Sequence, residues 1–419
     1  MGIIKKIRKQ GWMIRSFVRV KFKVKKQLVK GFRNQNNFFP KKETNADIKN
    51  LMNCMLCPNM CRFDCPAVQA SKKETHSPAV KARIGYYLEM DRLDKITENI
   101  LPLFEGCVHC SGCKIWCPFD FAVGDLLEGV AIDLYQEDCL PKPIKEFSQR
   151  IRDNNGLYNK EKYSRAISSL KDMDTGEYYY FPGCVTIGNN LEVITGIRKI
   201  AEKAQIKIVS KPDQRQCCGA PSLYSGDIEK SKELAQFNIN HFTSFDVKGI
   251  ICECPECANM LENGYRKLGY QLDIPIYHIS EWLVNLIQSG KIKLKDGEKS
   301  KSYNKFFPIS YHDPCVLARK MNKSHFSYII LEQLFPNNFK VNPYSKEKTH
   351  CCGFGGLVNI VNHDLANEMA KRRLAEFAKE GIKTIVTSCP TCKYSFMKNN
   401  EKMQFEIVDL IELVSEMME

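Results

Sequence analysis

Long apolar runs are missing from this chain of 419 residues. A membrane-spanning helix needs roughly 18 or more consecutive apolar residues, and no stretch approaches that length, so we expect no membrane span. The N-terminus also lacks the apolar core and small-residue cleavage site of a secretory signal peptide. Glycine and proline number only 24 and 18, which excludes a collagen-like or low-complexity polymer.

Nucleotide-binding signatures are missing as well. A G-x-G-x-x-G turn after a strand would cradle a dinucleotide, and a P-loop would cradle a nucleoside triphosphate, but neither occurs here. The glycines of CCGFGG belong to a cysteine motif described below. We therefore expect no flavin or nicotinamide site in this chain. If the protein uses either cofactor, another subunit would carry it.

Acidic residues are absent from the first 33 positions, which carry 12 lysines or arginines. The net charge of +14 therefore belongs mainly to a basic amphipathic tail, residues 1–35. Apolar side chains interleave with the basic ones, a pattern typical of a segment that rests on an anionic lipid surface. The alternatives are a disordered basic arm, a segment that docks on a partner subunit, and a nucleic-acid arm. Because no recognition module accompanies the charge, we expect no nucleic-acid partner. We predict a cytoplasmic protein whose tail brings it to the inner face of the cell membrane.

Cysteine is what the chain has in excess: there are 20, most of them in tight motifs. A chain of this length can bury a hydrophobic core without disulfide staples, so that reason for keeping cysteines is weak. We interpret them as reduced thiols in a reducing compartment, most of them bound to metal.

The first cysteine system lies in residues 45–150, which have mostly helical patterns. Residues 107–118 read C-x2-C-x2-C-x3-C-P, the spacing of bacterial iron–sulfur clusters in which the fourth cysteine binds the neighbouring cluster. Residues 54–66 carry the partner motif, with one more residue between the second and third cysteines. A pair of zinc knuckles is the alternative. The spacing predicts two [4Fe–4S] clusters, cluster 1 on Cys54, Cys57, Cys61 and Cys117, and cluster 2 on Cys107, Cys110, Cys113 and Cys65.

An internal repeat fills the rest of the chain. Strand and helix patterns alternate over residues 176–295 and again over 303–419, which favours two stacked copies of one α/β unit. Each copy carries one cysteine, then the triplet CCG, then C-P-x-C, and the second set follows the first by 131 to 135 residues. The first set is Cys184, Cys217, Cys218, Cys254 and Cys257, and the second set is Cys315, Cys351, Cys352, Cys389 and Cys392.

The repeat also sets expectations for local structure. FFPISY, FKVNPY and IKTIVTS of the second copy are expected strands. Each copy closes with a strand and a helix, where Ser280 and Asp409 occupy the expected N-cap positions. The predicted fold class is therefore α+β and multidomain, with an α-helical two-cluster domain followed by two α/β cysteine-rich domains.

With these motifs in place, the sequence resembles known families. The segment 45–150 resembles the α-helical ferredoxin domain of fumarate-reductase-type iron–sulfur subunits. The repeat resembles the cysteine-rich CCG domain of heterodisulfide reductases, which also occurs in iron–sulfur subunits of glycolate, lactate and anaerobic glycerol-3-phosphate dehydrogenases. The order of domains over residues 45–419 is similar to the D-type subunit of heterodisulfide reductases. The resemblance implies up to two non-cubane [4Fe–4S] clusters, one per five-cysteine set, facing each other across a cleft and acting as the catalytic site. A zinc site or a plain cubane is the alternative for each set.

Other side chains are weaker candidates. His350 and the run His312-Asp313-Pro314 are near cysteines of the second copy, where they could donate protons or only hydrogen-bond a cluster sulfur. His109 and Trp116 are expected to pack around a cubane, and Cys139 and Cys252 to be structural thiols. The candidates for holding an anionic substrate are Arg215, Arg319 and Lys393.

Three functions fit these features. The first is an iron–sulfur oxidoreductase of heterodisulfide reductase type, in which electrons pass from the two ferredoxin-type clusters to the paired CCG site and reduce, or in reverse form, a thiol disulfide. Its redox partner would be a membrane cytochrome, a quinone-linked protein or a flavoprotein. The second is an electron-transfer subunit that relays electrons from a flavin dehydrogenase of glycolate, lactate or glycerol 3-phosphate to quinone. The third is a zinc- or cluster-based sensor or scaffold.

Overall fold

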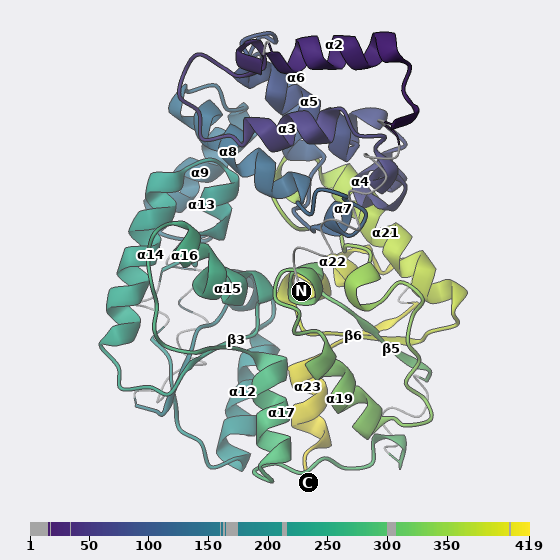
Figure 1. Cartoon of the computed structure of the whole chain (residues 1–419). Helices are drawn as coiled ribbons and strands as arrows, with labels where there is room; N and C mark the ends of the chain where they lie inside the picture. The colour runs from purple at the N-terminus through teal and green to yellow at the C-terminus, as the bar shows by residue number, and fades with distance from the viewer. Residues whose placement is uncertain are drawn as a thin grey trace.

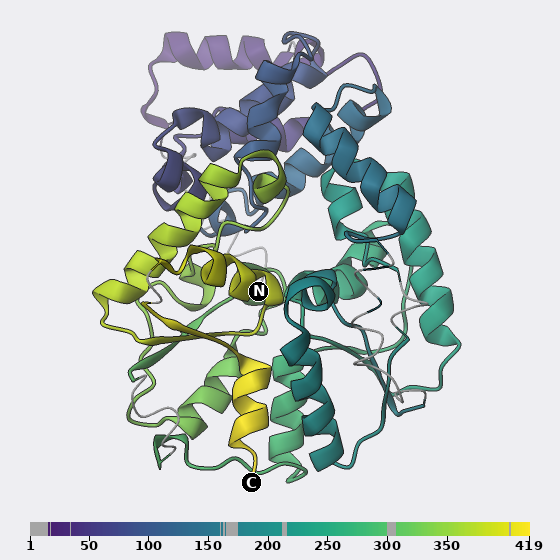
Figure 2. The same ribbon diagram turned by 180° about the vertical axis from the view of Figure 1, so that it is seen from behind.

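The computed structural model describes residues 35–159, 175–211, 216–299, 307–401 and 404–419, together with 16, 18–33, 161 and 164. A helical domain lies across one end of the molecule, and two small parallel sheets lie side by side beneath it (Figure 1). The view from behind shows the same three parts (Figure 2). No helix in the described part of the chain combines the length and the apolar character that a membrane span requires.

The helical domain is built around the helix α5 (Pro78–Glu89), which packs against α3, α6 and α8. Proline at the first position suits the start of α5, because its missing N–H would have no partner there anyway. Leu51 of α3 and Val130 of α8 are fully buried against it. The other helices of this part are α2 (Phe22–Arg33), α3 (Ile48–Met55), α4 (Pro66–Ser71), α6 (Thr97–Glu105), α7 (Gly112–Ile115), α8 (Val123–Gln136) and α9 (Lys142–Asn154), with 3-10 turns η1 (Gln35–Phe38), η2 (Met60–Asp64) and η3 (Glu74–His76).

The first repeat has a four-stranded parallel sheet in the order β2-β1-β3-β4. Tyr179 pairs with Val209 on one side and with Ile250 on the other, which fixes the register of the central strand. The strands are β1 (Tyr178–Tyr180), β2 (Ile208–Val209), β3 (Ile250–Cys252) and β4 (Ile276–His278). The helices are α11 (Cys184–Asn189), α12 (Leu191–Lys203), α13 (Ala220–Tyr224), α14 (Ile228–Thr243), α15 (Pro255–Asn259), the π-helix η4 (Met260–Gly264), α16 (Tyr265–Lys267) and α17 (Ile279–Gln288).

The second repeat has a three-stranded parallel sheet in the order β5-β6-β7. The prediction of a strand at FKVNPY is wrong, because this segment forms only an isolated bridge between Phe339 and Ile309. The strands are β5 (Ile309–His312), β6 (Thr384–Thr387) and β7 (Glu406–Asp409). The helices are α18 (Cys315–Arg319), α19 (His325–Leu334), α20 (Val358–Val361), α21 (His363–Lys379), α22 (Pro390–Asn399) and α23 (Leu410–Met417), with 3-10 turns η5 (Gly297–Lys299) and η7 (Lys346–Lys348).

The two repeats share one apolar core. Helices α12 and α17 of the first repeat lie beside α19 and α23 of the second, as both views show. Gly196 of α12 faces Ile411 of α23, and a Cβ at Gly196 would lie only 2.8 Å from the Ile411 side chain, so glycine permits this close approach. The α+β fold, with a helical domain followed by two α/β repeats, is thus as predicted from the sequence.

The two closing helices begin differently. Asp409 caps α23 with a capping box, in which its side chain accepts from the Ile411 N–H and Glu412 reaches back to the Asp409 N–H. The expected cap Ser280 is wrong, because His278 is the N-cap of α17 and accepts from the Ser280 N–H at 3.3 Å.

Candidate iron–sulfur centres

A cavity of about 600 Å³ between α3 and α7 is lined by a first group of thiols. Cys117 comes from the motif at residues 107–118, whereas Cys54, Cys57 and Cys61 come from the motif at residues 54–66. Burial raises the pKa of Cys54, and the neighbouring thiols of Cys61, Cys117 and Cys57 raise it further. The group therefore consists of the cysteines expected for cluster 1, with Cys113 also on the cavity wall: Cys54, Cys57, Cys61 and Cys117.

A second group of thiols acts electrostatically on a buried lysine. Lys81 of α5 is 1% exposed, and its Nζ donates to the carbonyl oxygen of Gly106 at 2.6 Å. Burial alone would lower the pKa of Lys81, but the surrounding sulfurs outweigh burial and raise it. The sulfurs that act on it are the set expected for cluster 2, namely Cys65, Cys107, Cys113 and Cys110.

The loop that carries this second group is wound tightly. His109 and Ser111 both adopt positive φ, at 51° and 57°, which turns successive backbone N–H groups toward one side. The Gly112 N–H points to the Cys110 sulfur at 3.5 Å, and the Val123 N–H points to the Cys113 sulfur at 3.3 Å. Backbone donors of this kind stabilise anionic sulfur ligands and tune their potential.

The two CCG sets lie at the carboxyl ends of the parallel strands. Cys184 and Cys254 follow β1 and β3, while Cys315 and Cys389 follow β5 and β6. Strands that run parallel end at the same edge of a sheet, so each set gathers at one edge. Each C-P-x-C motif opens a helix with proline in its first turn, and the Cys389 sulfur accepts from the Cys392 N–H at 3.5 Å.

The glycine of each CCG triplet has a left-handed backbone. Gly219 has φ 95° and Gly353 has φ 88°. A Cβ at Gly353 would lie 2.5 Å from the Ala366 carbonyl oxygen, so no other residue fits there without displacement. This sharp turn lets both cysteines of the pair face one site.

The two sets are electrostatic copies of each other. Hydrogen bonds from Cys217 and Cys257 lower the pKa of Cys218 to about 6. Hydrogen bonds from Cys351 and Cys392 likewise lower the pKa of Cys352 to about 6. In both repeats the second cysteine of the pair therefore has a lowered pKa, because two neighbouring thiols donate hydrogen bonds to it.

All ten CCG cysteines line one cavity of about 300 Å³ between the repeats. Its walls are largely apolar and aromatic, and Arg150 and Glu256 are the charged groups among the described residues that line it. Arg150 is exposed and stacks on Phe147 with 5.3 Å between guanidinium and ring centroid. The aromatic walls are Phe147, Tyr158, Tyr224, Phe354 and Tyr394.

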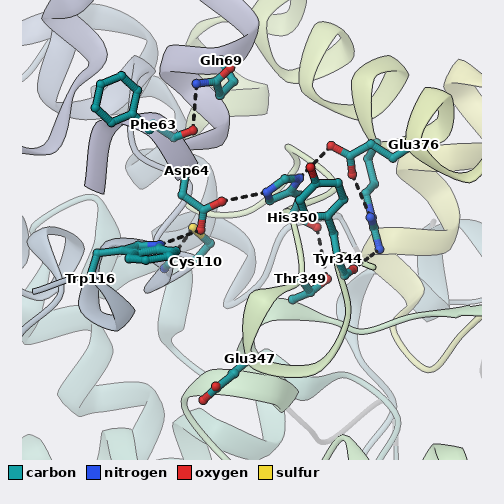
Figure 3. Close-up of polar contacts among 12 residues, drawn as sticks. Phe63, Asp64, Gln69, Cys110, Trp116, Tyr344, Glu347, Thr349, His350 and Glu376 are labelled. Atoms are coloured by element: carbon teal, nitrogen blue, oxygen red, sulfur yellow. Dashed lines mark hydrogen bonds and ion pairs between the residues drawn. The ribbon is translucent and has the colours of Figure 1, made fainter. Parts of the chain in front are cut away.

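A hydrogen-bonded chain joins the helical domain to the second repeat (Figure 3). His350 lies 2.9 Å from Asp64 through Nε2 and 2.7 Å from Glu376 through Nδ1, and Trp116 donates to Asp64 at 3.0 Å. Burial alone would lower the pKa of His350, but the hydrogen bonds to the two carboxylates outweigh burial and raise it. Because Asp64 precedes Cys65 in the chain, the contact brings the second thiol group toward the second CCG set.

Two family models match this chain. A 4Fe-4S dicluster domain matches residues 25–122, and a cysteine-rich domain named CCG matches residues 178–262 and 309–397. The chain is a CCG-domain iron–sulfur protein. Its order of domains, dicluster first and two CCG copies after it, is the order expected from the cysteine spacing.

Several curated proteins are similar to this CCG-domain protein over most of its length. The D-type subunit of dihydromethanophenazine:CoB--CoM heterodisulfide reductase from Methanosarcina barkeri is 27% identical, covering 74% of this chain and 77% of its own. The B-type subunit of fumarate reductase (CoM/CoB) from Methanothermobacter marburgensis is 24% identical, covering 89% and 74%. The probable glycolate oxidase iron-sulfur subunit of Bacillus subtilis is 24% identical, covering 85% and 90%. The protein is thus an iron–sulfur subunit of the electron-transfer type that these relatives represent.

The donor atoms fit iron–sulfur clusters. Each of the four groups offers four or five cysteine sulfurs, and thiolates are the usual ligands of such clusters. A tetrahedral zinc site has four ligands, so a five-sulfur set exceeds its need. The thiols are also available as ligands, since all 20 cysteines lie in the described part of the chain and none of them forms a disulfide there.

The remaining sequence candidates have structural partners. Arg319 donates to the carbonyl oxygens of Cys110, Glu347 and Thr349, and Lys393 pairs with Glu192 and Glu412, so neither is placed to hold an anion in the cavity. Arg215 lies outside the described residues.

The other thiols and rings also have ordinary surroundings. His109 lies 4.3 Å from the Tyr224 ring and 3.8 Å from Glu128. Trp116 lines the first cavity but is 53% exposed. Cys252 is fully buried in β3, and Cys139 donates to the Glu137 carbonyl oxygen at 3.3 Å.

Lys81 is the residue that sequence reasoning missed. It lies on the buried face of α5 with Ala82, Gly85 and Tyr86, and Glu89 is the other charged residue buried on this helix. A lysine on such a face is a signal that could have been read, because a buried ammonium needs negative charge nearby.

Proposed function

We propose that this protein is an iron–sulfur oxidoreductase of heterodisulfide reductase type. In this proposal two [4Fe–4S] clusters of the helical domain exchange electrons with a paired CCG site, which reduces a thiol disulfide or forms it in reverse. The single observation that supports it best is the cavity of about 300 Å³ with ten cysteines on its wall. The two clusters would fill much of that cavity, so the support comes from the two complete five-cysteine sets that face each other across it.

The residues of the cavity suit a small disulfide. The aromatic walls favour an apolar body and exclude water, and Arg150 places a positive charge at the exposed mouth. We infer that an anionic tail on the substrate would pair with Arg150 while the sulfurs lie deeper. When bound, the clusters supply the one-electron transfers that splitting a disulfide requires.

The proposed cluster ligands are the sequence-predicted ones. The helical domain would hold cluster 1 on Cys54, Cys57, Cys61 and Cys117 and cluster 2 on Cys107, Cys110, Cys113 and Cys65. The repeats would hold one non-cubane cluster each, on Cys184, Cys217, Cys218, Cys254 and Cys257 and on Cys315, Cys351, Cys352, Cys389 and Cys392. What supports this set is the cavity wall that the cluster 1 thiols share and the cavity that the ten CCG thiols line together.

The test uses full-length protein reconstituted anaerobically with iron and sulfide. With reduced viologen as donor, we expect disulfide-dependent viologen oxidation for at least one member of a panel of low-molecular-weight disulfides. Cys352→Ser should abolish it, and Cys139→Ser, which removes a thiol outside the four groups, should not. Loaded protein that reduces no disulfide on the panel would contradict the proposal.

A second candidate is the electron-transfer subunit of a flavin dehydrogenase. The similarity to a glycolate oxidase iron-sulfur subunit over 90% of that protein's length favours it. In that case a flavoprotein partner would reduce the loaded clusters on adding a 2-hydroxy acid or glycerol 3-phosphate. In that case the CCG site would not reduce added disulfides.

The basic tail is the proposed contact with a membrane or a membrane-bound redox subunit. In the described helix α2, Phe22 is 82% exposed and Val29 is 48% exposed, with lysines between them. Cosedimentation with anionic vesicles that is lost when residues 1–33 are deleted would support lipid binding. Binding unaffected by this deletion would refute a role for the tail.

A further inference from the structure

His312 occupies a fixed position beside the second CCG set. It ends β5, is fully buried, and packs edge-on against Phe396 with 4.7 Å between ring centroids. One imidazole nitrogen and the sulfurs of Cys352 and Cys392 all lie within 4.8 Å of one another. The His312 ring therefore lies close to Cys352 and Cys392.

Arg373 determines which nitrogen of His312 carries the proton. Its Nε donates to Nδ1 of His312 at 3.4 Å, and a guanidinium can only donate. The Nδ1 atom must then be the acceptor, so the proton of the neutral ring is on Nε2. Arg373 itself is held by Glu376 at 2.8 Å and by the Tyr344 carbonyl oxygen at 2.7 Å.

The Nε2–H group of His312 has no hydrogen-bond partner among the described residues. A buried donor without an acceptor is unfavourable, and such groups in proteins commonly serve a bound species. Because Nδ1 is occupied by Arg373, Nε2–H is the ring group left to serve this site.

We propose that His312 donates a hydrogen bond from Nε2–H to a sulfur of the cluster bound by the second CCG set and thereby raises the reduction potential of that cluster. A donor to sulfur stabilises the more negative, reduced state. In the first repeat the residue three positions before the leading cysteine is Phe181, which has no N–H in its side chain. The two halves of the cavity are therefore unequal, and the second repeat is the more easily reduced half. This inference rests on the proposed cluster at Cys315, Cys351, Cys352, Cys389 and Cys392.

The test is a redox titration of the full-length, reconstituted protein followed by EPR. The signal of the second CCG cluster is assigned by its loss in Cys352→Ser. His312→Phe copies the first repeat, and we expect its equilibrium constant for reduction to fall about tenfold, a shift of about 59 mV for one electron. His312→Gln keeps a side-chain N–H and should recover part of this shift. His325→Phe, which replaces an exposed histidine, should leave the potential unchanged.

If a variant fails to assemble its clusters, a measurement on the wild-type protein can still test the hydrogen bond. Pulsed EPR with ¹⁵N-histidine should show a weak nitrogen coupling and an exchangeable proton at this cluster. A strong coupling from direct iron ligation, or no coupling, would overturn the hydrogen bond. An unchanged potential in fully loaded His312→Phe would overturn it as well. Wild-type protein that binds no iron at this set would refute the proposed function together with the inference, whereas the other outcomes leave the proposed function intact.

Discussion

Glu89 of the helical domain is a buried carboxyl group whose ionisation should lower the folding stability. Its side chain shares the Thr44 hydroxyl with Asp133, at 2.9 Å and 2.6 Å. One hydroxyl has a single proton, so it cannot donate to both carboxylates at once. Asp133 also accepts from the Asn45 backbone and side-chain N–H groups, which favours its ionised form. Glu89 is therefore the group that keeps a proton.

The pH dependence follows from the direction of this shift. Burial, and then the Asp133 charge, raise the pKa of Glu89 from 4.5 to about 7. Below pH 4.5 the carboxyl is protonated in both folded and unfolded chains, so there is no penalty. As pH rises toward 7 the unfolded chain ionises first, and folding stability falls by about 3 kcal/mol at most. Glu89→Gln cannot ionise, so we expect it to stabilise the domain at pH 8 by about 1–3 kcal/mol and to be nearly neutral at pH 4.5.

Native-state hydrogen exchange of α5 and α8 amides is the suitable assay, because a multidomain protein need not unfold in one step. The opening free energies of variant and wild type are compared at the same pH, which removes the intrinsic pH dependence of exchange. Glu98→Gln on the exposed side of α6 is the matched control and should have no effect at either pH. A Glu89→Gln variant that is destabilised at pH 8 would mean that Glu89 is ionised and stabilised by Lys42, 3.9 Å away.

Further predictions concern the ligands and the domain contact. Cys117→Ser should remove the cluster-1 signal and Cys65→Ser the cluster-2 signal, each lowering the iron content from about 16 to about 12 atoms per chain. Asp64→Asn should weaken the contact between the helical domain and the second repeat by about 1.5–3 kcal/mol, because His350 loses its charged partner in the helical domain, and faster hydrogen exchange in α4 and α21 would show it. Anaerobic iron removal should loosen α5, because Lys81 has no carboxylate within ion-pair distance among the described residues, and exchange of its amides would report this.

The sequence was most informative where ligands are close in the chain. The motif from Cys107 to Cys117 forms one loop and a short helix, so its spacing alone carries the geometry. Strand and helix order in the repeats could also be predicted, because apolar periodicity and length depend on local sequence. The N-cap of α17 could not, since serine is the favoured cap residue and only the structure shows that α17 begins directly after β4, with His278 as its cap.

Contacts between distant side chains outside the cysteine motifs were beyond sequence reasoning. His350 and Asp64 are 286 residues apart, and nothing in either motif indicates the other. The same holds for Arg373 and His312, which are 61 residues apart and lie on a helix and a strand that become neighbours only in the folded repeat. The chemistry of each motif could be inferred from its own sequence, but the side chains that orient these motifs come from distant parts of the chain.

The internal repeat explains how equal cysteine sets acquire unequal surroundings. In the second repeat the CCG triplet continues as Phe-Gly-Gly, and Cβ atoms at Gly355 and Gly356 would lie 2.6 Å from the carbonyl oxygens of Val108 and Cys107. In the first repeat the triplet continues as Ala-Pro-Ser, and a side chain at the last two of these positions would forbid that approach. The carbonyl groups of Cys107 and Val108 can therefore approach the second CCG turn closely, whereas side chains after the first CCG triplet would exclude such an approach there. If electrons leave the helical domain through the cluster proposed on the Cys107–Cys113 loop, they reach the second repeat first. His312 is on that same side, so the half of the cavity nearest the electron source is also the half with the N–H donor.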